Sequence, residues 1–551
     1  MDIARAYELL TAAFADHDVR ISLSEEAREV LSQLDERWLV SAISPLTLTY
    51  PDRTIMLRVF LCDTQPLEDR NTLRDIRPSD VALPVAHGVI IVTPAGGGVG
   101  EPHHRYLLVP SARVMAGEAR YIFVKPDSLK GKAMSQVYRR LYGKAPIMLD
   151  RYRQSRNSAY QQIWQATDPE LATAAPLIRR EGDAPWMWVA MHWLENGGAE
   201  SWAFRQAELA RDAGYKILIT VDRGAPQRLL GRAYEIADEV FLCAQTFGVK
   251  ERAPFVEALL RTYRPVAIHI HHSVLAYEHL GLVRTLLPDT RVEDSVHIVE
   301  HRGGGYVADS VRASRLIDLH HVISPQLREI YLREAGIAPE KVAYYPLTGL
   351  TARASAEASG EIPARPRAAL RVGFLGRMSL QKRPFLFVDV ARRLHASAPQ
   401  DFEFVMQGSG ELEHYTRDHL AKAGLADVVT TRAWGPVTDF LAEIDVLLIP
   451  SDNEGLTLTS LEATSAGVLV VSADVGSQIT VVAPGALLPR EPNAFVAGAV
   501  ALLRRLAADD GERRSLIARQ RGLVADLASR TSAEEFYTDH YATTAVAKTK
   551  E

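Results

Sequence analysis

The sequence predicts an α/β protein in which two doubly wound parallel sheets follow a smaller domain that is α+β or mainly antiparallel. The length of 551 residues corresponds to about two to four domains. From about residue 185, short runs rich in Val, Ile and Leu alternate with amphipathic helical stretches, which is typical of parallel strands buried on both faces. Thr351–Ala369 interrupts this alternation. It is rich in Ala, Ser, Pro and Arg and has no apolar face, so we interpret it as the linker between the two sheets.

Two series of apolar runs predict the strands of these sheets. The first series is Trp186–Trp193, Lys216–Val221, Glu239–Cys243, Val266–His271, Val296–Glu300 and His320–Ile323. The second series is Arg371–Leu375, Phe402–Met406, Val428–Thr431, Asp445–Pro450 and Val468–Ser472, each followed by a helical segment such as Pro384–Leu394. We therefore expect domains over residues 180–355 and 365–535. A helix over about Ser532–Thr544 is expected to cross back to the first sheet, with its end and a tail in residues 536–551.

Residues 1–165 have a different pattern and predict a separate accessory module. Extended segments separated by turn-rich sequence are expected at Trp38–Tyr50, Thr54–Leu61, Val85–Thr93, Tyr106–Val109 and Tyr121–Val124. A helical connector over Ala159–Ala174 would join this module to the first sheet. The module could recognise an acceptor, mediate oligomerisation or anchor the protein.

Composition and charge exclude several classes of protein. With 63 Lys and Arg against 68 Asp and Glu, the formal net charge is −5, which argues against a dedicated nucleic-acid binder and against a disordered chain. Cys62 and Cys243 alone cannot build a disulfide framework or a cysteine-rich zinc site. The N-terminus does not resemble a signal peptide, and no stretch has the length of a membrane span. These features predict a cytoplasmic protein, which could attach to the inner face of a membrane.

Two cations are expected at the carboxyl edge of the second sheet. The strand Arg371–Leu375 is followed by Gly376 and Arg377, and Lys382 stands just before the next helix. Ligands of open α/β sheets bind at this edge, and a helix N-terminus there adds N–H donors that favour an anion. The pattern therefore predicts a phosphate site. The alternative interpretation is a pair of solvated loop charges.

A second motif follows the strand that ends at Pro450. Gly455, Leu456 and Thr457 would offer free backbone N–H groups at the start of a helix, and Glu454 would lie just before it. Glu462 lies about two helical turns further on. Carboxylates suit the vicinal hydroxyls of a sugar, because one carboxylate accepts two hydrogen bonds. Taken singly, each acid could instead be a helix-terminal or salt-bridged surface residue.

Three segments together resemble a known family. GRMSLQK, QGSGEL with its Gly408 and Gly410, and EGLTLTSLE occur in the order and spacing of the C-terminal half of the retaining GT-B glycosyltransferases called family 4, or glycosyl transferases group 1. The resemblance covers about residues 180–540 and implies two Rossmann-like domains. It also implies transfer of a sugar from a nucleotide-diphosphate sugar, more often UDP- than GDP-linked, without a metal or other cofactor. The expected acceptor is a glycan, a lipid-linked or a protein acceptor, as in cell-envelope polysaccharide synthesis.

The first sheet carries two further features of this resemblance. The loop with Gly197 and Gly198 resembles the family's N-terminal glycine loop, in which backbone N–H groups approach a diphosphate or the acceptor. In the family's His-x-His pattern the second histidine faces the donor sugar, which identifies His271 here. Two positions depart from the family: Leu347–Leu350 replaces an Asn-Gly-Val-Asp turn, and Thr480 stands where a glutamate is common. These departures concern donor-sugar selectivity.

The resemblance assigns roles to the candidate residues. Arg377 and Lys382 would stabilise the leaving diphosphate, Glu462 would hold the ribose, Glu454 the sugar hydroxyls, and His271 the sugar near its reacting carbon. Three alternatives remain at this stage: a catalytically weak scaffold or glycan-binding subunit, a GT-B sugar-nucleotide epimerase, and a phosphorylase with a lysine-bound cofactor.

Metal, membrane and partner expectations complete the sequence analysis. Asp16-His-Asp18 is not interpreted as a metal site, because it follows a helical segment and not a buried strand. His103-His104 is interpreted as a surface turn, because no Cys or cluster of acids stands near it. Lys125–Lys144 carries six Lys and Arg against one Asp. Such a segment is either a solvated face or a contact with an anionic lipid carrier or membrane surface. No nucleic-acid partner is expected, and an oligomer could form through the N-terminal module.

Overall fold

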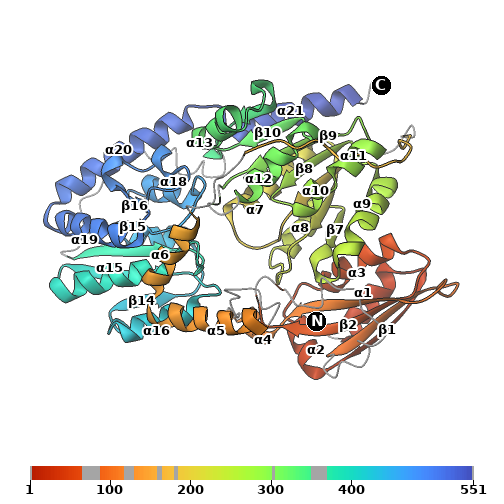
Figure 1. The fold of residues 1–551 in the computed structure, drawn as a ribbon, viewed down its shortest axis with the longest axis horizontal. Coiled ribbons are helices and arrows are strands. Elements are labelled where there is room, and N and C mark those ends of the chain that lie inside the picture. Colours follow the sequence, from red (N-terminus) through yellow and green to blue (C-terminus); the bar gives the residue numbers. More distant parts are fainter. Residues whose placement is uncertain are drawn as a thin grey trace.

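The computed structural model describes residues 3–64, 67, 87–116, 129–157, 164–178, 184–298, 300, 304–348 and 369–548. Over these residues the chain forms one mixed sheet and two parallel sheets, each covered by helices (Figure 1). The predicted fold class is confirmed. The interdomain linker expected at 351–369 and the extended segment expected at Tyr121–Val124 lie outside the described residues, apart from Ala369.

The middle domain, residues 184–348, contains a parallel sheet in the order β11-β10-β9-β8-β5-β6-β7. Its strands are β5 Trp186–Met191, β6 Lys216–Val221, β7 Glu239–Leu242, β8 Ala267–His271, β9 Arg291–Val296, β10 Leu319–Val322 and β11 Val342–Tyr344. Its α-helices are α7 Gly198–Asp212, α8 Leu230–Ile236, α9 Val249–Tyr263, α10 Val274–Glu278, α11 Leu280–Leu286, α12 Gly305–Arg312 and α13 Pro325–Glu329. The strand expected at Val296–Glu300 lies five residues earlier, as β9. The prediction misplaced this strand because β9 contains the buried polar residues Glu293, Asp294 and Ser295 and therefore has no continuous apolar run.

The C-terminal domain, residues 369–548, contains a parallel sheet in the order β14-β13-β12-β15-β16-β17. Its strands are β12 Leu370–Leu375, β13 Phe402–Gln407, β14 Val429–Arg432, β15 Val446–Ile449, β16 Leu469–Ala473 and β17 Leu487–Leu488. Its helices are α15 Pro384–Ser397, α16 Glu413–Lys422, α17 Val437–Glu443, α18 Leu458–Ser465, α19 Pro492–Ala508, α20 Asp510–Ala528 and α21 Ala533–Lys548.

The last helix, α21, returns to the middle domain, as expected for a helix crossing back to the first sheet. It packs against α7, and Tyr541 is 3% exposed. His540 Nε2 lies 2.7 Å from Glu293 Oε1 of β9, and Arg205 of α7 forms an ion pair with Glu534. The C-terminal residues therefore connect the two parallel-sheet domains a second time (Figure 1).

The N-terminal sheet has the order β1-β3-β2-β4, with antiparallel pairs except β2 and β4, which are parallel. Its elements are α1 Ile3–Ala13, β1 His17–Leu23, α2 Glu25–Leu31, α3 Trp38–Thr49, β2 Ile55–Cys62, β3 Gly88–Pro94, β4 His103–Pro110 and α4 Ala112–Met115. The prediction of an extended Trp38–Tyr50 is wrong: this segment is helix α3. Its apolar residues are buried on several sides against α1, α9 and β7, which masks the helical period.

Two further helices of the N-terminal region, α5 Leu129–Lys144 and α6 Pro146–Asn157, pack against the C-terminal domain. Tyr142 of α5 is 1% exposed and contacts the rings of Phe385, Tyr415 and His419. Among the described residues, 129–157 thus pack on the C-terminal domain and the N-terminal sheet does not, although both fall within the module expected at 1–165.

The connector expected to be helical at Ala159–Ala174 is not helical where it is described. Residues 164–178 form an irregular strap on the middle domain. Thr167 N donates to Arg312 O at 3.1 Å, and Leu177 N donates to Leu286 O at 2.7 Å. The strap packs closely over α11, because a Cβ at Gly281 would lie 2.0 Å from Glu170 O. The strap therefore makes backbone hydrogen bonds to neighbouring elements and not the internal hydrogen bonds of a helix.

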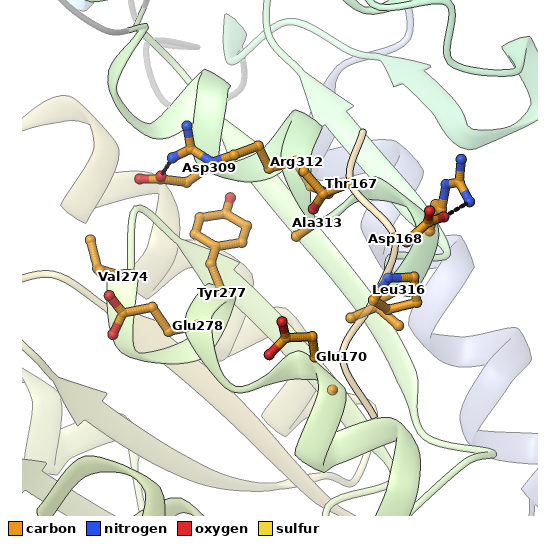
Figure 2. A pocket seen from close by; sticks show the side chains of 13 residues that line it. Thr167, Asp168, Glu170, Val274, Tyr277, Glu278, Asp309, Arg312, Ala313 and Leu316 are labelled. Atoms are coloured by element: carbon orange, nitrogen blue, oxygen red, sulfur yellow. Dashed lines mark hydrogen bonds and ion pairs between the residues drawn. The ribbon is translucent and has the colours of Figure 1, made fainter. Parts of the chain in front are cut away.

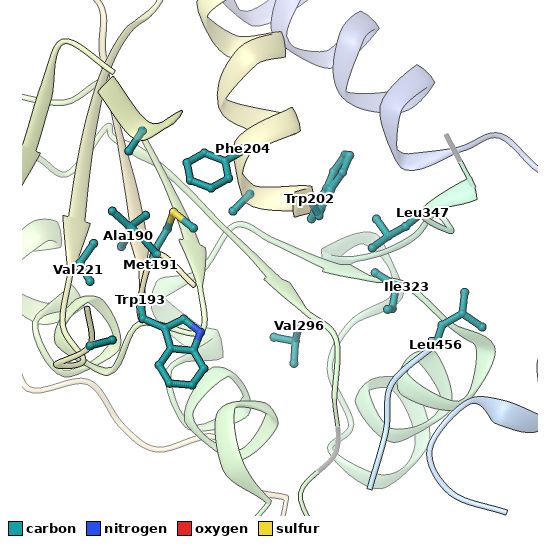
Figure 3. Packing of buried hydrophobic residues seen from close by; sticks show 14 of the residues in the cluster. Ala190, Met191, Trp193, Trp202, Phe204, Val221, Val296, Ile323, Leu347 and Leu456 are labelled. Atoms are coloured by element: carbon teal, nitrogen blue, oxygen red, sulfur yellow. The ribbon is translucent and has the colours of Figure 1, made fainter. Parts of the chain in front are cut away.

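The hydrophobic cores of the domains are continuous across the interdomain face. Figure 3 shows Leu456 of the C-terminal domain on the side where Ile323 and Leu347 of the middle domain lie. Each of these three side chains is nine-tenths or more buried. No helix of the described residues is both long and apolar enough to span a bilayer.

Candidate functional site

An ion pair joins the two motifs of the C-terminal domain. Strands β12 and β15 are parallel neighbours, so the loops that follow them leave the same edge of the sheet. Lys382 follows β12 and Glu454 follows β15. Lys382 Nζ lies 2.6 Å from Glu454 Oε1, and Glu454 is 4% exposed. The structure therefore brings together two predicted site residues that are 72 positions apart.

Hydrogen bonds to backbone carbonyls hold the two loops against each other. Gln381 Nε2 donates to Asn453 O at 3.0 Å, and Asp452 N donates to Gln381 O at 2.7 Å. Because Gln381 precedes Lys382 and Asn453 precedes Glu454, these bonds fix the spacing of the charged pair. Gln381 is part of the sequence motif, but its contact with the loop after β15 could be recognised only from the fold.

Glycines make the close approach of a third loop possible. Gly376 directly follows β12, and the loop after β13 contains Gly408 and Gly410. At φ of 139°, Gly408 has a conformation that side chains rarely adopt, and a Cβ there would lie 2.1 Å from Gly376 O. At φ of 152°, a Cβ on Gly410 would lie 2.8 Å from Met378 O and 3.0 Å from Arg377 Cγ. Gly408 and Gly410 thus allow the loop after β13 to pack directly against the backbone on either side of Arg377.

Arg377 faces the middle domain. Its guanidinium carbon lies 5.0 Å from the centroid of the Trp193 ring, within the range of a cation–π contact. Arg223, which follows β6, lies 4.6 Å from the same ring. Arg377 Nε is buried and makes no hydrogen bond with the residues that the structure describes. The C-terminal domain therefore presents to the middle domain a cation whose buried Nε–H is available to a ligand.

The loop after β5 contains a polar cluster that sequence analysis missed. Trp193 Nε1 donates to Glu200 Oε1 at 2.5 Å, and His192 Nε2 lies 3.2 Å from the same oxygen. Burial raises the pKa of Glu200 and holds the pKa of His192 well below its usual range, so the histidine is neutral. A Cβ on Gly197 would lie 2.1 Å from Glu200 Oε2. The glycine loop was the available signal, since Glu200 follows it in the first turn of α7.

Where the two domains meet, each contributes a glycine to the contact. A Cβ on Gly455 would lie 1.9 Å from the carbonyl oxygen of His297, which follows β9. A Cβ on Gly198 would lie 3.4 Å from Leu458 Cδ1 of α18. Thr480 Oγ1 donates to Gln326 Oε1 at 3.1 Å. The start of α18 is therefore in direct contact with the middle domain.

His271 ends β8 and is 2% exposed. Neither ring nitrogen has a hydrogen-bond partner within the described part of the chain, and the ring stacks on His269 with centroids 4.8 Å apart. Burial, together with nearby histidines, holds the pKa of His271 well below its usual range. Burial also lowers the pKa of His272 to about 4. The strand end thus carries neutral imidazoles, of which His271 has unused polar atoms.

Helix α18 carries the remaining predicted residues. Thr457 caps its start, and its Oγ1 accepts from Gln478 Nε2 at 2.8 Å. Leu456 is 5% exposed. Glu462 is half-buried, and burial raises the pKa of its carboxyl. That carboxylate has no hydrogen bond or ion pair with any described side chain, which leaves it free to accept hydroxyl donors.

One pocket of the middle domain lies away from the predicted site residues. A pocket of about 530 Å³ lies in the middle domain between α10, α11, α12 and the strap (Figure 2). Asp309 pairs with Arg312 there, and Asp168 pairs with Arg315. None of the predicted site residues lines it. Among the described residues, no group of three or more His, Cys, Asp or Glu could hold a metal ion.

Residues 369–505 match the family model described as "Glycosyl transferases group 1". This part of the chain is a glycosyl transferases group 1 domain. It contains Arg377, Lys382, Glu454 and Glu462, whereas His271 and the glycine loop of the middle domain lie outside the matched range.

Curated relatives match parts of the chain. A D-inositol 3-phosphate glycosyltransferase of Stackebrandtia nassauensis is 30% identical over 231 residues, 40% of this chain and 49% of that protein. The lipopolysaccharide core biosynthesis mannosyltransferase LpsB of Rhizobium meliloti is 35% identical over 112 residues, 19% of this chain and 32% of that protein. The chain thus spans about half the length, or less, of these relatives.

Solved structures are similar at low sequence identity. A sucrose-phosphate synthase from Thermosynechococcus elongatus is 18% identical, with a TM-score of 0.49 over 67% of this chain and 100% of that chain. Anabaena HepE in complex with UDP is 16% identical, with a TM-score of 0.49 over 66% of this chain and 99% of that chain.

Gly455→Ala is expected to weaken the contact between the domains. The added Cβ would overlap the carbonyl of His297, and overpacking of this kind costs about 1–3 kcal/mol. The thermal midpoint should fall by about 2–6 °C. Gly522→Ala in α20 is the control, because a Cβ there meets nothing within 4 Å. Equal midpoints for the two variants would contradict a tight contact at Gly455.

Proposed function

We propose that this protein is a retaining, metal-independent glycosyltransferase that moves a sugar from a nucleotide-diphosphate sugar, with UDP favoured, to a glycan, glycolipid or protein acceptor. The observation that carries this proposal is the contact of 2.6 Å between Lys382 Nζ and Glu454 Oε1 at the carboxyl edge of β12 and β15. The group 1 domain over 369–505 supports the same activity.

Departure of the diphosphate creates negative charge in the transition state. Lys382 and Arg377 would stabilise this charge, together with backbone N–H groups at the start of α18. Glu454 keeps the Lys382 ammonium at a fixed position before the donor binds. Fixed donors and cations are effective because they need little rearrangement during the reaction. In this proposal they take the place that a divalent metal has in metal-dependent transferases.

The hydroxyl groups of the sugar and of the ribose would donate hydrogen bonds to side chains of the site. Glu454 binds the sugar hydroxyls through the oxygen that Lys382 leaves free, and Glu462 binds the ribose hydroxyls. His271 is neutral, so one ring nitrogen donates and the other accepts near the reacting carbon. Following the family resemblance, the acceptor attacks from the face of the departing phosphate, whose oxygen takes the acceptor proton. This geometry retains the anomeric configuration.

Water must be excluded, since it competes with the acceptor for the sugar. The contacts of Gly455 with His297 and of Arg377 with Trp193 lie between the domains. Closed domains would reduce hydrolysis and strengthen the charge interactions in the cleft. We propose that opening at this interface admits the donor and releases the product nucleotide.

Lys382→Ala and Glu454→Gln are expected to lower turnover by about 10²-fold, the effect of losing one preorganised contact to the developing charge. Turnover is measured as transfer to an acceptor, or as slow donor hydrolysis, with UDP-, GDP- and ADP-sugars tried in turn. Lys216→Ala is the control, because Lys216 is exposed at the opposite edge of the middle sheet. Wild-type turnover in both site variants would overturn the proposal.

Metal removal is expected to leave turnover unchanged, within about twofold, because Arg377 and Lys382 supply the positive charge. The measurement compares enzyme dialysed against EDTA with enzyme supplied with Mg²⁺ or Mn²⁺. Loss of activity in EDTA that is restored by either ion would contradict metal independence.

The acceptor class is proposed to be lipid-linked, and the exposed face of α5 supports a membrane-surface contact. Val137 and Met134 are 48% and 40% exposed, and Arg140 and Lys144 are exposed at helical spacing from them. Met148 of α6 is 56% exposed. A basic helix face with apolar side chains suits an anionic lipid surface. The match to the mannosyltransferase LpsB agrees with an acceptor of this class.

The double substitution Arg140→Glu and Lys144→Glu is expected to lower binding to vesicles containing phosphatidylglycerol by at least about tenfold, since each basic residue contributes about 1 kcal/mol. Vesicle co-sedimentation measures this. The charge-matched control changes the exposed Arg504 and Arg519 to Glu. Binding that is equal in both double variants would rule out α5 as the contact.

A further inference from the structure

Helix α6 lies beside α15 and α19 of the C-terminal domain, although the whole middle domain separates them in sequence (Figure 1). It is outside the range 369–505 that matches the group 1 family. Its polar side chains nevertheless contact the two loops that carry Lys382 and Glu454. The contacts pass through two residues, Arg383 and Asp452.

Arg383 directly follows Lys382 and is 0% exposed. Its φ is 47°, a left-handed conformation that costs about 1–3 kcal/mol for a residue other than glycine and persists only where surrounding contacts hold it. Nε donates to Pro450 O at 2.5 Å and Nη2 to Ser451 O at 2.8 Å. The guanidinium thus ties the end of the Lys382 loop to the beginning of the Glu454 loop.

The buried charge of Arg383 is balanced in part from outside the C-terminal domain. Asp150 Oδ2 of α6 lies 3.2 Å from Nη1, and its side chain is 5% exposed. Asp452 is the other carboxylate near this guanidinium, at 3.8 Å. Removing one partner of a buried ion pair is strongly destabilising, because the remaining charge stays desolvated. The buried, left-handed Arg383 therefore relies on α6 for part of its charge balance.

Gln154, one turn after Asp150 on α6, contacts the other loop. Its Nε2 donates to Asp452 Oδ1 at 3.0 Å. Asp452 precedes Glu454 by two residues, and its backbone N–H donates to Gln381 O. Arg490 also holds Asp452, with Nη2 to Oδ1 at 2.9 Å. Helix α6 therefore contacts both loops: Gln154 contacts the loop of Glu454, and Asp150 contacts the loop of Lys382.

We propose that Asp150 and Gln154 are positioning residues of the donor site, which set the Lys382–Glu454 geometry through Arg383 and Asp452. Neither touches a substrate in this proposal. The donor site is thus completed by a helix of the N-terminal region, and the group 1 domain alone lacks part of its support. The inference rests on the proposed function for its catalytic consequence, but the geometry it describes is independent of the reaction.

The test uses Asp150→Asn and Gln154→Ala in the full chain, with Arg151→Ala as the matched control on the same helix. Arg151 pairs with Glu491, and both side chains are about half exposed. Amide hydrogen exchange should accelerate about fivefold in residues 377–383 and 450–457 in both test variants, the effect of losing one hydrogen bond. The control should leave these segments unchanged. The KM for the donor should rise about fivefold in the test variants, with a smaller change in kcat.

Each outcome decides the proposal. Unchanged exchange in both segments would overturn it, as would equal acceleration throughout the C-terminal domain, which would indicate a structural role alone. Gln154→Ala keeps the test valid if the buried Asp150→Asn variant does not fold. If the wild-type protein turns over no donor, the proposed function fails, while the exchange measurement still decides whether α6 positions the loops. Faster exchange with an unaltered KM in an active enzyme would contradict the catalytic consequence.

Discussion

The contact between Lys382 and Glu454 is the constraint on which the site depends. It forms because β12 and β15 are parallel neighbours, so that both loops leave one edge of the sheet. Keeping a charged pair at this spacing requires the side-chain and backbone hydrogen bonds of Gln381 on one side and the buried guanidinium of Arg383 on the other. The glycines after β12 and β13 let the neighbouring loops approach as closely as this arrangement needs.

The sequence predicted those parts of the molecule whose signal is local. Buried parallel strands give short apolar runs, so β6 and the strands β12 to β16 were predicted within a few residues, whereas the two-residue strand β17 was not predicted. The loops of Lys382 and Glu454 were also predicted, since a motif and a strand end suffice to place them. Helix α3 and strand β9 were not predicted correctly. The apolar residues of α3 show no helical period, and β9 contains buried polar residues in place of an apolar run.

Other features depend on contacts between distant residues, which no single segment reveals. Trp193 matters because Arg377 and Arg223 both approach its ring, and these come from different strands and domains. Arg383 looks like a loop cation in the sequence and is fully buried in the structure. The N-terminal region contacts both other domains: Arg105 Nε donates to Thr246 O of the middle domain, and α6 braces the C-terminal domain.

A crystal structure with an unhydrolysed nucleotide-diphosphate sugar tests the central claim most directly. The account predicts the distal phosphate within hydrogen-bond distance of Arg377, Lys382 and the first N–H groups of α18, with the sugar between Glu454 and His271. A diphosphate bound elsewhere, for example in the pocket under the strap of the middle domain, would contradict it. So would a bound donor whose phosphates are held by a metal ion and not by these side chains.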